Sequence, residues 1–187
     1  YDLNVTAEPE IGGERASGTD LSLSSFAQTL TNSDTVAHFV EYAFTPKIYN
    51  DDGDTEACSN GQTVIRIWVN PTPQIRVSSD TILCDGETAN FTIRNPNVFL
   101  NGFYEYDLVV TPDSPAIEGE RASENGLTLT SFDQTLTNAD TVVHFVDYHF
   151  TPRIRTLDGG NDCENGLDAT IRIWVNPNPE IRVIADT

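Results

Sequence analysis

The sequence predicts an all-β protein made of tandem immunoglobulin-like β-sandwich repeats. The segment IRIWVNPTPQIRV at residues 65–77 returns as IRIWVNPNPEIRV at residues 171–183, an offset of 171 minus 65, or 106 residues. A period of this length fits one small β domain per copy and is too long for a solenoid repeat or a propeller blade. Short runs of alternating apolar and polar residues are separated by Gly, Pro, Asn and Asp, and no long stretch has helical periodicity.

The strands are expected where apolar side chains occupy every second position. The segments TVAHFVEYAFTP at 35–46 and ETANFTIRN at 87–95 both follow this pattern. The segment IRIWV at 65–69 alternates aliphatic residues with Arg66 and Trp68. Because successive side chains of a strand point to opposite faces, we expect the aliphatic side to be buried and the Arg and Trp side chains to be exposed.

Paired prolines mark the boundaries between copies, at 71 and 73 and again at 177 and 179. Such a connector is stiff and extended, so it spaces neighbouring domains. We therefore expect an incomplete first repeat at 1–71, a complete repeat at 72–177 and the first strand of a third repeat at 178–187, as in a window on a longer array. Half a sandwich exposes strand edges, so residues 1–70 should be completed by further chain or by a neighbouring molecule.

The charge is strongly acidic, with 10 Lys and Arg against 29 Asp and Glu and a net charge of -19. This field repels nucleic acid and anionic lipid, which excludes both as expected partners. No apolar run is long enough for direct membrane insertion. The partners we expect first are the neighbouring repeats of the same long chain.

Three cysteines are present. Cys58 and Cys163 occupy equivalent acidic loops before the IRIWV strand, and Cys84 follows the strand that begins the complete repeat. Within the repeat bounded by the proline pairs, Cys84 and Cys163 are the two internal cysteines, so we expect them to form a disulfide and Cys58 to be unpaired. The competing pairing, Cys58 with Cys84, would link neighbouring domains. Either disulfide requires an oxidising compartment outside the cytoplasm.

Two acidic loops contain the oxygen ligands that calcium prefers. The candidate ligands are Asp51, Asp52, Asp54 and Glu56 in the first copy and Asp158, Asn161, Asp162 and Glu164 in the second. Neither loop has the spacing of an EF-hand, and a solvated acidic loop is the simpler interpretation. Calcium is the one cofactor that the sequence suggests.

The exposed face of the repeated strand offers a second candidate site. Trp68 and Trp174 could stack on sugar rings, which would make each copy a carbohydrate-binding module. The simpler interpretation is that each Trp covers the end of its domain or packs on the following linker.

Catalysis is not expected. The chain has no G-x-S-x-G motif and no Cys beside a His. His38 and His144 are equivalent residues within predicted strands, and one imidazole per copy does not make a metal site, so both are expected to be structural.

The residues also resemble a known group of repeats. The motifs that show this are VNPxP at 69–73 and 175–179, DTxLCxGE at 80–87, and FTPRIR at 150–155 followed by DGGxDCxxG at 158–166. With these motifs the chain resembles the PKD-like and Ig-like tandem repeats of very large cell-surface proteins of Bacteroidota.

This resemblance implies export by the type IX system and a role as an adhesin, a gliding-motility filament or a stalk. It also favours the Cys84–Cys163 pairing. In addition, Thr35, Thr81 and Thr141 each follow Asp and precede an aliphatic residue, a context that the resemblance links to O-glycosylation.

The predicted function is therefore that of a non-enzymatic stalk or filament segment of an extracellular, cell-surface adhesin, whose further partners would be surface glycans or other cells. The alternative is a carbohydrate- or calcium-binding module. A third hypothesis is an accessory domain of a hydrolase.

Overall fold

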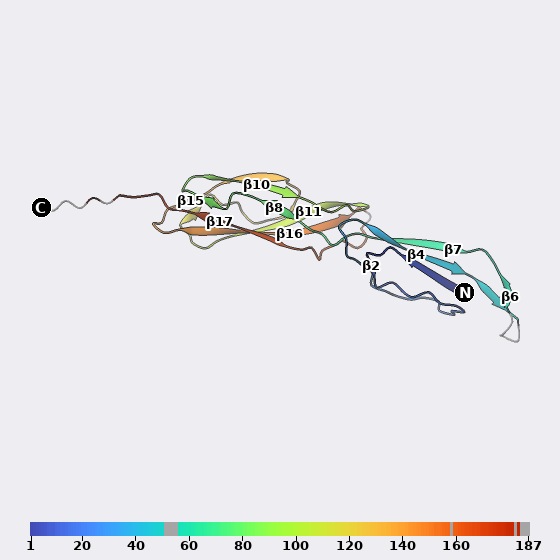
Figure 1. Ribbon diagram of the computed structural model, residues 1–187. Coiled ribbons are helices and arrows are strands. Elements are labelled where there is room, and N and C mark those ends of the chain that lie inside the picture. Colours follow the sequence, from blue (N-terminus) through green and yellow to red (C-terminus); the bar gives the residue numbers. More distant parts are fainter. Residues whose placement is uncertain (51–55, 158, 182, 184–187) are drawn as a thin grey trace. The chain divides into compact units, whose positions relative to one another are not determined.

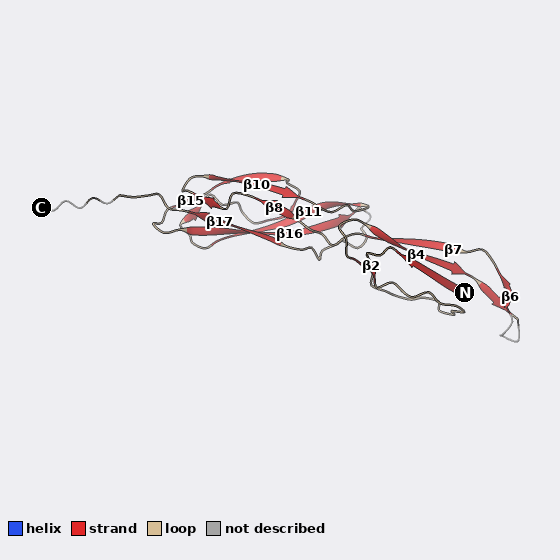
Figure 2. Ribbon diagram, viewed as in Figure 1, coloured by secondary structure: helices blue, strands red, loops and turns tan. Residues whose placement is uncertain are grey.

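The computed structural model describes residues 1–50, 56–157, 159–181 and 183, without the side chains of residues 56 and 57. Every regular element among them is a β-strand (Figure 2). The prediction of an all-β fold is confirmed. No helix in the described part of the chain is long and apolar enough to cross a membrane.

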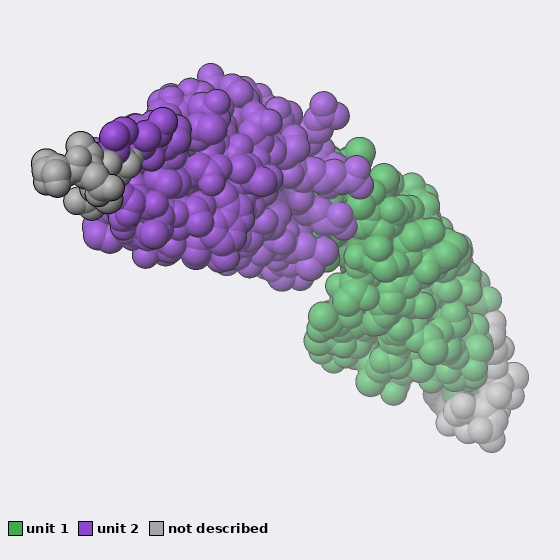
Figure 3. All heavy atoms as spheres, turned by 60° about the vertical axis from the view of Figure 1, so that its left-hand side comes forward, with its two compact units in different colours: residues 1–72, 97–100 green, residues 73–96, 101–187 purple. Residues whose placement is uncertain are grey.

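The chain divides into two compact units (Figure 3). Unit 1 comprises residues 1–72 and 97–100, and unit 2 comprises residues 73–96 and 101–187. The division falls between Thr72 and Pro73, inside the predicted proline connector. In the segment predicted to begin a third repeat, residues 178–181 and 183 form no strand, and the other residues lie outside the described part.

Unit 2 is a sandwich of two sheets. One sheet has the order β14-β10-β8 and the other the order β13-β11-β16-β17-β9, and β12 and β15 form a separate two-stranded ribbon. All of these pairs are antiparallel except β9 and β17, which are parallel. The strands are β8 (Arg76–Ser78), β9 (Ile82–Leu83), β10 (Thr88–Arg94), β11 (Gly102–Pro112), β12 (Ile117–Glu118), β13 (Glu124–Leu127), β14 (Ser131–Thr135), β15 (Thr137–Asn138), β16 (His144–Thr156) and β17 (Ala169–Val175).

Alternation along β10 builds the core of unit 2. Ala89, Phe91 and Ile93 are buried while the residues between them are exposed. The ring centroid of Phe91 lies 4.4 Å from that of Phe132 and 4.6 Å from that of Tyr148, so this side chain joins the two sheets. Each such side chain contributes about 1.5–3 kcal/mol through removal of apolar surface from water.

Unit 1 contains part of the same architecture (Figure 1). Its main sheet has the order β1-β4-β7, and these strands are the sequence equivalents of parts of β11, β16 and β17. Two ribbons, β2-β3 and β5-β6, complete the described strands. The strands are β1 (Asp2–Ala7), β2 (Ile11–Gly12), β3 (Thr31–Asn32), β4 (His38–Thr45), β5 (Lys47–Tyr49), β6 (Glu56–Ser59) and β7 (Thr63–Val69).

The same sequence motif forms one long strand in unit 2 and two short ones in unit 1. In unit 2, β16 continues through Pro152 because β11 pairs with it from Gly102 to Pro112. In unit 1 the equivalent Pro46 separates β4 from β5, and β1 pairs with β4 only as far as Thr45. Pro152 is therefore accommodated within a continuous, paired strand.

Candidate functional site

An early strand of unit 2, β9, pairs in parallel with its last strand, β17. The N–H of Trp174 donates to the carbonyl of Thr81 at 2.9 Å, and the N–H of Asn176 donates to the carbonyl of Leu83 at 2.8 Å. The side-chain amide of Asn176 donates to the same Leu83 carbonyl at 3.2 Å. We call these three hydrogen bonds the terminal clamp, because they join the first residues of the unit to its last strand.

A second contact of the same kind lies where the chain enters unit 2. Gln74 and Leu167 form a parallel bridge, and the N–H of Leu167 donates to the carbonyl of Pro73 at 2.8 Å. The entering segment is thus attached just before β17 begins, and β9 is attached where β17 ends.

A buried asparagine, Asn138, also binds the end of β17. It is 3% exposed, and its side-chain amide donates to the carbonyls of Val142 at 2.8 Å and Val175 at 2.9 Å. Asn32 makes the equivalent bonds in unit 1, at 2.8 and 2.9 Å. The sequence interpretation missed this pair, although the repeated QTLTN motif marks both residues.

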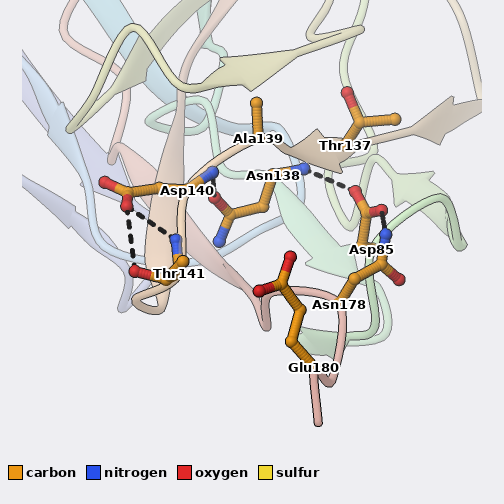
Figure 4. Close-up of a pocket in the computed structure, with 8 residues that line it drawn as sticks. All are labelled: Asp85, Thr137, Asn138, Ala139, Asp140, Thr141, Asn178 and Glu180. Atoms are coloured by element: carbon orange, nitrogen blue, oxygen red, sulfur yellow. Dashed lines mark hydrogen bonds between the residues drawn. The ribbon is translucent and has the colours of Figure 1, made fainter. Parts of the chain in front are cut away.

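A hollow of about 290 Å³ lies beside this asparagine in unit 2 (Figure 4). The carboxylate of Asp85 accepts hydrogen bonds from the Asn138 N–H and from the side-chain amide of Asn178. The carboxylate of Asp140 accepts one from the N–H of Thr141 at 2.6 Å. The carboxylates of Asp85 and Asp140 therefore already accept hydrogen bonds from the protein itself. The described residues contain no group of three or more His, Cys, Asp or Glu side chains placed to hold a metal ion.

Each equivalent histidine lies between carboxylates. In unit 2 the His144 ring is 3.2 Å from Asp113 through Nδ1 and 3.1 Å from Asp140 through Nε2. Hydrogen bonding to Asp140, followed by that to Asp113, raises the pKa of His144 above its ordinary value. The ring thus links the loop after β11 to the turn before β16.

The arrangement recurs in unit 1. His38 is 2.9 Å from Glu8 through Nδ1 and 3.0 Å from Asp34 through Nε2, and Glu10 lies 3.7 Å from Nδ1. Hydrogen bonds to Asp34 and then Glu8 raise the pKa of His38.

The predicted calcium loop of unit 2 surrounds an arginine. The Arg155 guanidinium binds Glu105, Asp162 and Glu164, each at 2.8 Å. Asp162 also accepts the N–H of Thr156 at 2.8 Å, and this bond together with Arg155 lowers its pKa. The guanidinium of Arg155 therefore lies between Asp162 and Glu164, two of the candidate calcium ligands, and its single positive charge offsets part of their negative charge.

The other candidate calcium ligands fall largely outside the described residues. This applies to Asp51, Asp52, Asp54 and Asp158, and to the side chain of Glu56. Asn161 is described and exposed.

Both Trp residues lie on the outer face, as predicted for the Arg and Trp side of the repeated strand. Trp68 is 49% exposed and Trp174 is 38% exposed. Each faces a Phe on the neighbouring strand, with ring centroids 5.0 Å apart for Phe39 and Trp68 and 5.1 Å apart for Phe145 and Trp174.

An arginine covers each phenylalanine ring. The guanidinium of Arg66 lies 4.2 Å from the Phe39 centroid, and that of Arg172 lies 3.6 Å from the Phe145 centroid. Cation–π contacts of this kind contribute about 0.5–1 kcal/mol at exposed sites. We call each Trp, Phe and Arg group an aromatic patch; one occurs in each unit.

The predicted disulfide between Cys84 and Cys163 is wrong, because both thiols are free. Cys84 directly follows Leu83, which pairs with Val175, and Val175 in turn pairs with His144. Cys163 instead bridges to Ile154, ten positions further along β16. At about 3.3 Å per residue, this places the cysteines on the order of 30 Å apart, whereas a disulfide needs Cα atoms within about 7 Å.

The error has a topological cause. The sequence showed that both cysteines lie within the repeat bounded by the proline pairs, which does not say at which end of the sheet each one lies. Because β9 pairs in parallel with the end of β17, the residue after β9 lies where β17 finishes. The loop before β17 lies where that strand starts, at the opposite end of the sheet.

Cys58 is also free and exposed, so the alternative pairing with Cys84 is not formed either. It pairs with Ile48 across β5 and β6. Burial, and secondly the charge of Asp162, raises the pKa of the Cys163 thiol, which keeps it protonated and less reactive.

The three candidate glycosylation residues differ in accessibility. Thr81 and Thr141 are exposed and Thr35 is half-buried. The N–H of Thr35 donates to the preceding Asp34 carboxylate at 2.6 Å, as that of Thr141 does to Asp140. The repeated Asp-Thr pairs thus form local turns that also position the carboxylates beside the two histidines.

Comparison with known proteins assigns the chain to no family. No protein-family model matches the sequence, and no curated protein does. Among solved structures, the chain has a similarity to the cohesin module from a Clostridium perfringens ATCC13124 family 33 glycoside hydrolase, with a TM-score of 0.31 and 11% sequence identity. That alignment covers 57% of this chain and 98% of the cohesin module.

Proposed function

We propose that the chain is a non-enzymatic, load-bearing segment of an extracellular stalk or filament, of the kind found in large repetitive surface adhesins. The tandem repeat and the acidic charge support this role. The net charge of -19 favours a solvated rod over self-association. The resemblance to PKD-like repeats of Bacteroidota adds type IX export, adhesion and gliding motility to the proposal.

The terminal clamp is the observation that carries the proposal. Force along a tandem array acts on unit 2 where the chain enters, at Pro73, and where it leaves, after Asn176. It therefore pulls β9 and β17 in opposite directions along their length. Because the two strands are parallel, this load acts in shear on the clamp bonds, which have to break together rather than one after another.

Force spectroscopy on single molecules tests this role. Asn176→Pro removes both hydrogen bonds that Asn176 donates to Leu83, so it should lower the force needed to unfold unit 2. The matched control is Leu127→Ala in β13, which pairs with β11 alone and does not link the two chain ends. Leu127 is 6% exposed, so its truncation costs about 2–5 kcal/mol while the unfolding force should stay near that of the wild type.

Unit 1 supplies a comparison within the same molecule. Among its described residues, β7 pairs with β4 alone and has no parallel partner. We therefore expect unit 1 to unfold at lower force than unit 2. Equal unfolding forces for the Asn176→Pro variant and the wild type would remove the mechanical argument.

The aromatic patches support a second candidate function, the binding of carbohydrate. An exposed indole beside a second ring occurs at the same place in both units, and aromatic faces can stack on sugar rings. A glycan array tests this function with Trp174→Ala and Trp68→Ala, separately and together. Glycan binding that falls with each substitution supports a carbohydrate-binding function. If no glycan binds, only the proposal of a load-bearing stalk remains.

A further inference from the structure

We propose that Asn60, in the turn between β6 and β7 (Figure 1), is a modification site at which the chain converts its own asparagine to aspartate and isoaspartate. The nucleophile is the main-chain nitrogen of Gly61, and water is the other reactant. The inference concerns a chemical change of unit 1 after folding, and it does not rest on the proposed stalk function.

The first observation is the contact between the two reacting groups. The N–H of Gly61 donates to the side-chain oxygen Oδ1 of Asn60 at 2.7 Å. A carbonyl bond is about 1.2 Å long, so the Cγ of Asn60 lies at most about 3.9 Å from that nitrogen. Reacting atoms in a near-attack geometry are about 3–3.5 Å apart, so a small rotation of the side chain is enough to bring Cγ to the nitrogen.

The second observation is the open space around the pair. Asn60 and Gly61 are both exposed, and they lie between the last residue of β6, Ser59, and the first residue of β7, Thr63. Apart from the adjacent residues, no described atom lies within 4 Å of a Cβ added at Gly61. Because glycine also has the widest choice of backbone angles, the turn can rotate into the attacking geometry, and water can reach the product.

The equivalent asparagine in unit 2 has the same neighbour but not the same freedom. Asn165 and Gly166 stand two and three residues after a cysteine, as the pair in unit 1 does. A Cβ added at Gly166 would lie 2.1 Å from the main-chain oxygen of Pro152, so this glycine is packed against β16. The N–H of Leu167, the next residue, donates to the carbonyl of Pro73 at 2.8 Å. Both contacts oppose the backbone rotation that the attack needs.

The other two Asn-Gly pairs of the chain, at 101–102 and 125–126, are restrained by their neighbours. The glycine N–H of the pair at 125–126 donates to the Asp107 carboxylate at 3.0 Å, so the hydrogen of this nitrogen points at another residue. The glycine of the pair at 101–102 begins β11 and is packed against Arg155, whose carbonyl oxygen would lie 2.4 Å from an added Cβ. Among these four described pairs, the one in the β6–β7 turn alone is exposed and free of such contacts.

The reaction balances with water. The nitrogen of Gly61 loses its proton and bonds to the Cγ of Asn60, the bond from Cγ to the side-chain nitrogen breaks, and ammonia leaves with that proton. The product is a succinimide ring, and water then adds to one of its carbonyl carbons. Opening of the bond between Cγ and the ring nitrogen gives aspartate. Opening of the bond between the main-chain carbonyl carbon and that nitrogen gives isoaspartate.

The turn can take up the product without loss of strand pairing. Isoaspartate lengthens the main chain by a single carbon atom, between Ser59, which ends the pairing of β6, and Thr63, which begins that of β7. Either product adds a negative charge to a chain whose net charge is already -19. We therefore expect unit 1 to stay folded while the modified fraction grows with the age of the molecule.

Peptide mapping of the folded 187-residue chain, incubated in mildly alkaline buffer, tests the proposal. Mass spectrometry measures the loss of the amide at each Asn-Gly pair, and enzymatic methylation of isoaspartate identifies the rearranged product. We expect Asn60 to be deamidated about 10-fold or more faster than Asn165, because a misplacement of about 1 Å can slow a reaction by about 100-fold. In urea, where both pairs are unfolded, the two rates should become similar. Equal rates in the folded protein, or an unchanged ratio in urea, overturn the inference.

Two substitutions in the turn separate attack by Gly61 from direct hydrolysis of an exposed amide. Gly61→Ala places a methyl group beside the attacking nitrogen, in open space that it fills without a clash, and restricts the backbone, so deamidation of Asn60 should slow by about 10-fold or more. Gln62→Ala is the matched control, because Gln62 is exposed and the Asn-Gly pair is retained, so the rate should stay that of the wild type.

The identity of the product gives a measurement that needs no variant. Attack by the main-chain nitrogen yields isoaspartate together with aspartate, whereas direct hydrolysis yields aspartate alone. Absence of isoaspartate from the modified wild-type chain, or deamidation of the Gly61→Ala variant at the wild-type rate, contradicts the proposed reaction.

Discussion

At the scale of residues, the repeated polar groups link loops to strands. His144 and His38 each bind carboxylates through both ring nitrogens. Arg155 binds Glu105 of β11 and two carboxylates, Asp162 and Glu164, of the loop that was considered as a calcium site. Each of these side chains thus holds two or more carboxylates of an acidic chain beside one positively charged or protonatable group.

The contacts of His144 with Asp113 and Asp140 predict that the stability of unit 2 depends on pH. The pKa of His144 is raised above 6.5 in the folded state, so its contribution is complete below about pH 6.5 and is lost as the pH rises through the folded pKa. The pKa of Asp140 is lowered from 3.8, so its contribution is present above that value and is lost as the pH falls. His144→Gln should therefore lower the melting temperature of unit 2 more at about pH 5.5 than at about pH 9.

Thermal unfolding of both proteins across this range measures the effect. His149→Gln is the control, because His149 is 42% exposed at its side chain and lies beside a single carboxylate, Asp168. A His144→Gln effect that is independent of pH would contradict the assigned role.

The contacts of Arg155 with the acidic loop predict that calcium stabilises unit 2 only when this arginine is removed. In the wild type, millimolar calcium chloride should leave the melting temperature of unit 2 nearly unchanged, because the Arg155 guanidinium already lies among the carboxylates of Glu105, Asp162 and Glu164 and repels a divalent cation. Arg155→Gln should lower the melting temperature and make it rise again with calcium, because uncompensated carboxylates attract a divalent cation. Differential scanning fluorimetry with calcium and with EDTA measures both effects. A calcium response of the wild type equal to that of the variant would show that the arginine does not take the place of the ion.

At the scale of elements, the same sequence takes different environments in the two units. The IRIWV strand is an edge of the described sheet in unit 1 and lies between β16 and β9 in unit 2. Its alternation correctly predicts which side faces inward. Whether that side is buried depends on a second layer that lies elsewhere in the sequence.

This difference predicts unequal costs for one substitution. Ile173→Ala should destabilise unit 2 by about 2–5 kcal/mol, because it leaves a cavity in a closed core. Ile67→Ala should cost less than about 1 kcal/mol, since its side chain is 39% exposed and mostly solvated already. Chemical denaturation of the two variants and the wild type gives the comparison. Equal losses would mean that the inner face of unit 1 is covered in solution.

At the scale of the whole molecule, topology decides which residues can meet. The cysteines of unit 2 lie at opposite ends of its larger sheet. The asparagine–aspartate contacts around the hollow and the terminal clamp lie together at the end where the chain leaves the unit.

This placement predicts that the chain keeps its thiols apart under oxidising conditions. After incubation with oxidised glutathione, peptide mapping without reduction should find no Cys84–Cys163 peptide, because the ends of a sheet cannot approach without unfolding. Cys84 should be alkylated faster than Cys163, whose thiol is half-buried and has a raised pKa. Recovery of the Cys84–Cys163 peptide from folded protein would contradict the observed topology.

The sequence by itself determined the all-β fold class, the period of the repeat and the inward face of each strong strand. These features follow from local patterning, which the pleat of a strand and the missing N–H of proline translate directly into structure. It also identified the exposed Trp residues, because their alternation with aliphatic residues places them on the outer face.

Only the tertiary structure decided which groups meet. The parallel pairing of β9 with β17 separates Cys84 from Cys163 and creates the terminal clamp. Arg155 reaches Glu105 across the β11–β16 pair, from fifty positions away in the sequence. Strand order and direction set such contacts, and they arise from burying one sheet face against another. The alternation within a single strand is the same whichever neighbour it receives.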